Sequence, residues 1–91
     1  METINTDARS GYPQFMSWKL QGDNEAIVQV VSDKGLEIGQ ELKHRGKING
    51  KDYFHNAAIR EIIEQREARG THNPPKVFQQ LIVEGSVNIL S

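Results

Sequence analysis

Five basic side chains between positions 43 and 60 are the residues of this chain best suited to binding chemistry. They are Lys43, Arg45, Lys47, Lys51 and Arg60. Asp52 is the one acidic residue among them, so this basic segment carries a net charge of +4, whereas residues 1–42 carry −4 and residues 61–91 carry −1. Such an asymmetric distribution favours contact with a polyanion, or with an acidic patch on another protein.

The middle of the basic segment has the sequence Gly46-Lys47-Ile48-Asn49-Gly50-Lys51. It differs from a nucleotide phosphate-binding loop in two respects, because its glycines are one residue too close together and Asp52 follows Lys51 in place of a hydroxyl residue. A carboxylate at that position repels phosphate, so nucleotide hydrolysis is excluded. The pattern instead predicts an Asn-Gly turn between two elements, with glycine at a positive φ.

The histidines give no support for catalysis. His44, His55 and His72 are separated by eleven and seventeen residues, so no pair has the spacing that binds zinc from one helix. We interpret each as a surface or capping histidine. The chain has no cysteine, which excludes disulfides and thiolate metal sites. We therefore expect no enzymatic activity, no metal and no cofactor.

The elements that must position the basic segment are predicted to be helices. Over residues 52–69, apolar residues recur at spacings of three and four, at Phe54, Ala58, Ile59, Ile62 and Ile63. Gly70 follows this segment at the position where glycine commonly ends a helix. The pattern predicts one helix over residues 52–69.

Residues 25–45 allow two interpretations. The β-branched run at residues 27–31 favours a strand, followed by a turn at residues 32–35. Ile27, Val31, Ile38 and Leu42 instead fall on one helical face, and Gly46 lies where a helix C-terminal glycine belongs. We prefer the helix, broken near residues 32–35, with a second half at about residues 36–45.

The flanking segments are short. Residues 15–20 predict either a strand or an apolar lead-in, and Trp18 is expected to be a core anchor because an indole can bury a large area. Asn73 as N-cap and Pro74 at the first helical position predict a helix that ends near Gly85. Residues 86–90 alternate weakly, which favours a short strand or an oligomer contact.

The composition sets the scale of the fold. The chain has 91 residues, of which 36% are hydrophobic, enough for one domain with a thin core. We predict a flexible N-terminal arm at residues 1–14 and a single globular domain at residues 15–91. The expected fold is mainly α, with three to four short helices, and a small α+β fold is the alternative. Because the core is thin, we also expect a homodimer.

The predicted element order, helix then basic turn then longer helix, is consistent with a helix–turn–helix that binds nucleic acid. In that hypothesis the phosphates contact Lys43, Arg45, Lys47 and Lys51, whereas Asn56 and Arg60 contact bases from the second helix. The alternative is an adaptor or inhibitor that docks on a partner protein through the basic turn or an apolar helix face. No signal peptide or spanning apolar run is visible, so we expect a regulatory protein of the cytoplasm.

Overall fold

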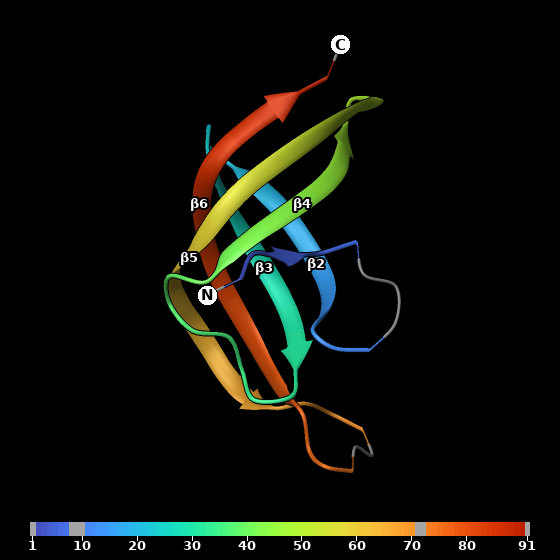
Figure 1. Cartoon of the computed structure of the whole chain (residues 1–91), viewed down its shortest axis with the longest axis vertical. Helices are drawn as coiled ribbons and strands as arrows, with labels where there is room; N and C mark the ends of the chain where they lie inside the picture. The colour runs from blue at the N-terminus through green and yellow to red at the C-terminus, as the bar shows by residue number, and fades with distance from the viewer. Residues whose placement is uncertain (1, 8–10, 71–72, 91) are drawn as a thin grey trace.

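The structure is a computed structural model that describes residues 2–7, 11–70 and 73–90, and this part of the chain forms six strands and no helix (Figure 1). The strands are β1 (Ile4–Asn5), β2 (Gln14–Gln21), β3 (Glu25–Ser32), β4 (Glu41–Ile48), β5 (Lys51–Glu67) and β6 (Val77–Ile89). The prediction of a mainly α fold, with a small α+β fold as its alternative, is therefore wrong. The described chain is all-β.

The six strands form one mixed sheet in the order β1-β4-β5-β6-β3-β2. β1 runs parallel to β4, and every other neighbouring pair is antiparallel. β5 and β6 are the longest strands, with 17 and 13 residues, and they run along the length of the molecule (Figure 1). Because β4 pairs only with the first half of β5, the second half of β5 has β6 as its one neighbour in the sheet.

The sheet curls until its two sides approach each other. Trp18 lies on the edge strand β2, yet its indole stacks on the imidazole of His44 on β4, with the ring centroids 4.2 Å apart. The indole Nε1–H also donates a hydrogen bond to Nδ1 of His55 on β5, at 3.2 Å. Since β2 and β4 are not paired strands, we call the boundary where their side chains meet the seam.

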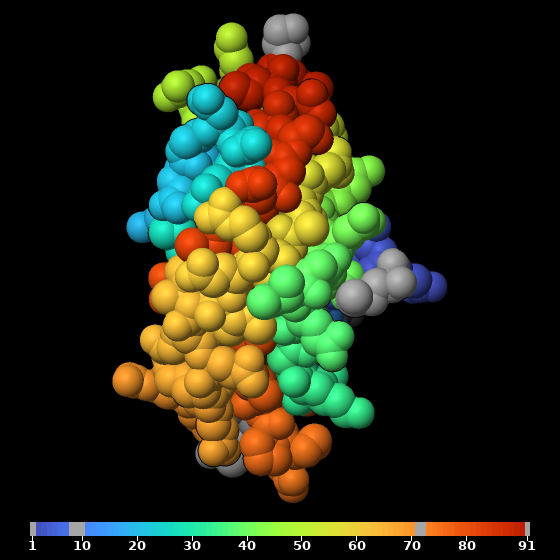
Figure 2. Space-filling view, turned by 90° about the vertical axis from the view of Figure 1, so that its left-hand side faces the viewer, coloured from blue at the N-terminus to red at the C-terminus, as the bar shows by residue number. Residues whose placement is uncertain are grey.

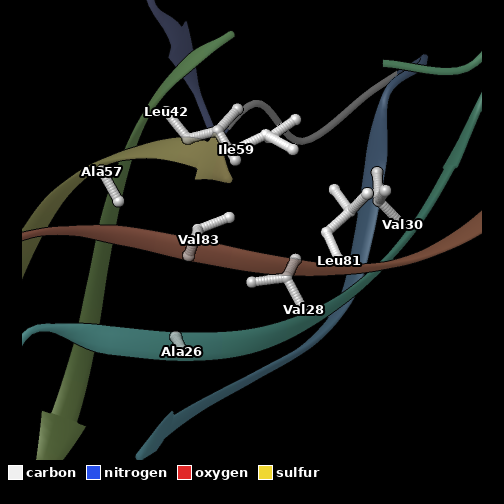
Figure 3. Packing of buried hydrophobic residues seen from close by; sticks show 8 residues of the cluster. All are labelled: Ala26, Val28, Val30, Leu42, Ala57, Ile59, Leu81 and Val83. Carbon is white, nitrogen blue, oxygen red and sulfur yellow. The ribbon is translucent and has the colours of Figure 1, made fainter. Parts of the chain in front are cut away.

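One face of the sheet, the inner face, carries the core. Its fully buried side chains alternate along each strand, as at Ala26, Val28 and Val30 of β3 and Leu81 and Val83 of β6. Figure 3 shows eight buried residues, contributed by four strands, that form one cluster. Partly buried apolar residues pack against this cluster, at Ile4, Phe15, Trp18, Leu20, Leu36 and Ile62.

The segment between β3 and β4 lies against β5 (Figure 2), and its Leu36 packs against the core cluster. Gln79 of β6 is fully buried and holds this segment, because its amide accepts a hydrogen bond from the Leu36 N–H at 2.6 Å and donates one to the Leu36 carbonyl at 2.9 Å. The Gln79 amide also donates to Oε1 of Gln65 at 3.0 Å. Every polar group of the Gln79 side chain is therefore paired.

The helix predicted over residues 52–69 is wrong, because β5 occupies residues 51–67. The start of β5 alternates as a strand should, with Tyr53, His55, Ala57 and Ile59 buried. Register shifts then occur between Ile59 and Glu61 and between Ile62 and Glu64. A bulge inserts an extra residue, so the next inward side chain comes three residues later, at Ile62. The three-residue spacing from Ile59 to Ile62 is also the spacing expected on one face of a helix.

The other helical predictions are also corrected. Residues 25–32 form a strand, which confirms the alternative that was not preferred, and the helix expected at about residues 36–45 is replaced by a loop and β4. The helix expected from Pro74 is replaced by β6, which continues through the weakly alternating residues 86–89. Residues 15–20 lie within β2. The side-chain pairing along these strands, and not helix propensity, decides their conformation.

Part of the segment expected as an N-terminal arm takes part in the sheet, since Ile4 and Asn5 pair with Leu42 and Lys43 of β4. The side-chain amide of Gln40 also donates a hydrogen bond to the Glu2 carbonyl at 2.6 Å. In the described residues, no helix is long and apolar enough to cross a membrane.

Candidate functional site

Three of the predicted site residues lie in a row on the exposed side of β4. Lys43, Arg45 and Lys47 alternate with the inward-facing Leu42 and His44, so strand geometry directs all three to the outer face of the sheet. We call this row the basic strip. Successive side chains of a strand point to opposite faces. Residues two apart in sequence are therefore neighbours on the same face.

Residues of β5 border the basic strip on the same face. Asn56 lies directly opposite Lys43, Phe54 opposite Arg45, and Asp52 opposite Lys47. Arg45 donates a hydrogen bond to the Asp52 carboxylate at 2.9 Å, and its guanidinium carbon lies 5.6 Å from the centre of the Phe54 ring. The hydrogen bond from Arg45 lowers the pKa of Asp52, so this carboxylate stays charged and offsets part of the positive charge of the strip.

Lys51 and Arg60 do not join the basic strip. Lys51 is opposite Ile48 at the end of the hairpin, in register with the inward-facing residues of the two strands. Arg60 forms ion pairs with Glu84 at 2.5 Å and Glu25 at 3.1 Å. The charge of Arg60 is therefore offset by two carboxylates that are distant in sequence. The helix that was expected to present Asn56 and Arg60 to bases does not exist.

A second feature lies across the edge of β4, at the seam. This seam hollow is lined by Thr6, Phe15, Met16, Ser17, Trp18, His44, Gly46, Lys47 and Tyr53. The Trp18 and His44 rings are nearly parallel, with an angle of 13° between their planes, and Tyr53 meets His44 edge to face at 5.9 Å. The absence of a side chain at Gly46 lets the Tyr53 ring lie over β4, because a Cβ there would come within 2.9 Å of two ring carbons.

Hydrogen bonds fix the protonation state of His55. Its Nδ1 accepts from Trp18, so Nε2 carries the proton and donates to the Asn24 carbonyl at 3.2 Å. Burial lowers the pKa of His55, although its hydrogen bonds to the Asn24 and Gly85 backbones work in the opposite direction. Burial also lowers the pKa of His44, against the opposing charge of Asp7. Both imidazoles are therefore held neutral near pH 7.

The prediction of surface or capping histidines is wrong for the two histidines that the structure describes. His55 is fully buried in the core face, and His44 is half-buried against Trp18, so neither is the surface or capping residue that was expected. His72 lies outside the described residues. Among the residues that the structure describes, no group of three or more histidine, aspartate or glutamate side chains could hold a metal ion.

A further hollow lies at the opposite end of the outer face, where Tyr12, Met16 and Phe78 surround Val31. Arg66 and Arg69 belong to its lining, and Arg66 forms an ion pair with Glu64 at 3.0 Å. Arg66 also covers the Phe78 ring, with its guanidinium carbon 4.2 Å from the ring centre. The lining of this hollow thus holds two arginines, whereas the basic strip has three cations in a row.

Sequence reasoning identified the cations of the strip but missed the rings beside them. Phe54 was assigned to the core face of a helix, whereas Trp18, Tyr53 and His44 come from three strands and meet only when the sheet curls. The alternation of Tyr53, His55 and Ala57 was the one signal that could have placed these rings on a common face. A comparison of this chain with protein families, with curated proteins and with solved structures finds no match.

Proposed function

We propose that the protein binds single-stranded nucleic acid, with the phosphates of the strand lying along the basic strip. The observation that carries this proposal is the row of Lys43, Arg45 and Lys47 on one exposed strand face. A row of cations that follows a straight strand can contact successive phosphates of one extended chain. Insertion of a helix into the major groove has no part in this proposal, because the described chain has no helix.

Neighbouring groups favour nucleic acid over an acidic protein surface. Proteins that bind single strands combine a cationic track with aromatic rings on which bases stack. Phe54 borders the basic strip on the outer face, and the rings of the seam hollow lie across the β4 edge from it. Asn56 beside Lys43 adds an amide that can pair with base edges or phosphate oxygens. We place this activity in the cytoplasm, where a cysteine-free chain needs no oxidising conditions.

The proposal predicts a modest and salt-dependent affinity. Neutralising three phosphates of a single strand gives a log–log slope of binding constant against salt of about −2. The measurement is fluorescence anisotropy of a labelled 12-nucleotide single strand, titrated with the protein at several salt concentrations. Replacing Lys43 and Lys47 by glutamine should reduce the slope to about −0.7, since Arg45 alone remains.

The matched control is the double variant Lys19→Gln and Lys34→Gln, which removes the same charge from exposed positions outside the strip. The control should retain the slope of the unchanged protein. Equal losses in both double variants would show that net charge, and not the basic strip, governs binding. Absence of any salt-dependent binding at low salt would contradict the proposal itself.

A further inference from the structure

We propose that the seam hollow receives an unpaired base of the same strand whose phosphates lie on the basic strip. This inference rests on the proposed function and names the part of the ligand that the second feature recognises. It assigns two roles to the two sides of the β4 edge, with the outer side contacting phosphates and the seam side contacting a base.

The two features are directly adjacent. Gly46 and Lys47 line the seam hollow, and the same two residues line a hollow on the outer side together with Asp7, Arg45 and Asp52. Gly46 places no side chain between the two hollows, and the Tyr53 ring lies over it. A nucleotide with its phosphate near Lys47 therefore needs to cross one strand edge to place its base at the seam.

The edge of β4 is open at this point in the described part of the chain. β1 pairs with β4 only at Leu42 and Lys43, and the last backbone contact of this segment is the Thr6 N–H with the Lys43 carbonyl at 3.0 Å. Arg45 and Lys47 direct their backbone N–H and C=O groups to the same edge as Lys43, because these directions alternate along a strand. These groups can form hydrogen bonds with the polar edge of a base.

The lining of the seam hollow suits a flat aromatic ligand. Phe15 and Trp18 supply partly exposed aromatic rings, Tyr53 lies beside them with 4% of its surface exposed, and the exposed Met16 adds a polarisable apolar surface. Thr6, Ser17 and Tyr53 also belong to the lining, and the Thr6 hydroxyl forms a hydrogen bond with Nδ1 of His44 at 2.8 Å. Base–aromatic stacking tolerates any sequence, since every base has a π face.

The aromatic rings on the outer face are less available. Arg45 lies over Phe54, and Arg66 lies over Phe78 at 4.2 Å from the ring centre. Lys76 likewise lies 4.6 Å from the centre of the Tyr12 ring. A base that stacked on these rings would have to displace a cation, whereas among the described residues no cation lies over Phe15 or Trp18 of the seam hollow.

The test compares two strands with the same phosphates, one oligothymidylate and one abasic strand of equal length, and uses the fluorescence of Trp18. Trp18 is the only tryptophan, so its fluorescence reports on the seam alone. Oligothymidylate should bind about tenfold more tightly than the abasic strand, on the scale of one stacked base, and should change Trp18 emission. The abasic strand should bind through phosphates without that change.

The position of the base is then located in the unchanged protein by ultraviolet cross-linking of a strand that contains 5-iodouracil, followed by peptide mapping. Cross-links to Phe15, Trp18 or Tyr53 support the inference, whereas cross-links confined to Phe54 or Phe78 overturn it. A Phe15→Leu variant, at a ring that lines the seam hollow and not the outer hollow around Val31, should lower the preference for the base-containing strand, whereas Ile63→Ala, an exposed apolar position on β5 away from the seam, should not.

The outcomes separate the two proposals. Equal affinity for both strands with unchanged Trp18 emission overturns the seam site and leaves phosphate binding on the basic strip intact. Failure of both strands to bind at low salt overturns the proposed function, and the seam site with it.

Discussion

At the scale of single residues, Gly85 of β6 lies so close to the backbone of β5 that no side chain fits there. A Cβ at this position would lie 1.9 Å from the Asn56 carbonyl oxygen and 2.6 Å from the Ala57 Cα, both of which belong to the backbone of β5. The Gly85 N–H also donates a hydrogen bond to the Asn24 carbonyl at 2.8 Å, which links β6 to the β2–β3 turn. No rotation of a side chain can relieve such a clash.

Gly85→Ala is therefore expected to lower the free energy of unfolding by about 3 kcal/mol or more, at the upper end of the cost of overpacking. Urea unfolding followed by Trp18 fluorescence measures this loss. The control is Ser86→Ala at the exposed neighbouring position, which should change the free energy of unfolding by less than about 0.5 kcal/mol. A stable Gly85→Ala protein would show that β5 and β6 can separate locally without cost.

The stability of the fold should also depend on pH through the buried imidazole of His55. Its folded pKa lies below the ordinary value of 6.5, because burial disfavours the charged form. Below pH 6.5 the unfolded chain gains a proton that the folded chain does not, so the free energy of unfolding should fall as the pH is lowered from 7.5 to 5.5. Protonation of Nδ1 would also set two donors, His55 and Trp18, against each other.

The measurement is urea unfolding at pH 7.5, 6.5 and 5.5, above the range in which most carboxylates titrate. His44 contributes in the same direction, since burial lowers its pKa too. The variant His44→Gln should therefore retain only part of the pH dependence, and the variants His55→Gln and His44→Gln combined should lose it. A free energy of unfolding that is constant over this range would contradict the assigned protonation state.

At the scale of elements, the β4–β5 hairpin depends on its two-residue turn. Asn49 and Gly50 both have positive φ angles, of 51° and 78°, as a type I′ turn requires. Gly50→Ala should cost about 1–2 kcal/mol of unfolding free energy, because an L side chain is strained in this conformation. Asn49→Gly should cost little, since glycine accepts the same φ. Thermal unfolding of the two variants compares them directly, and equal midpoints would contradict this account of the turn.

This turn was predicted from the sequence, whereas the β-branched run of β3 left strand and helix open and the helix was wrongly preferred. The strand nature of β5 was hidden, because its two bulges place apolar residues at helical spacing and because the buried His55 interrupts the apolar alternation. The contact of Trp18 with His44 depends on the curl of the whole sheet, which no local pattern encodes. The candidate site was therefore predicted only in part, through the cations of the basic strip.

At the scale of the whole molecule, folding brings carboxylates beside two cations of the basic segment. The basic segment carries +4 in sequence, but Asp52 pairs with Arg45, and Glu25 and Glu84 pair with Arg60. The acidic front of the chain thus supplies a carboxylate to the basic middle through strand pairing that brings Glu25 beside Glu84. Exposed ion pairs of this kind add little stability, but they leave the net positive charge of the basic segment on Lys43 and Lys47 of the basic strip and on Lys51 at the end of the hairpin.

The order of the strands predicts how protection from hydrogen exchange is distributed over the molecule. β3 and the first half of β5 have paired strands on both sides, as β6 does over residues 77–84, and they carry most of the buried core. Their amides should exchange most slowly, with opening free energies close to that of global unfolding, whereas the amides of β1 and of the edge strand β2 should exchange sooner.

Residues 61–67 give the sharpest test, because they pair with β6 alone. About every second amide there should be protected, since the others point away from β6. Amide exchange measured by NMR would contradict the sheet if all amides of residues 61–67 were protected alike, as in a helix.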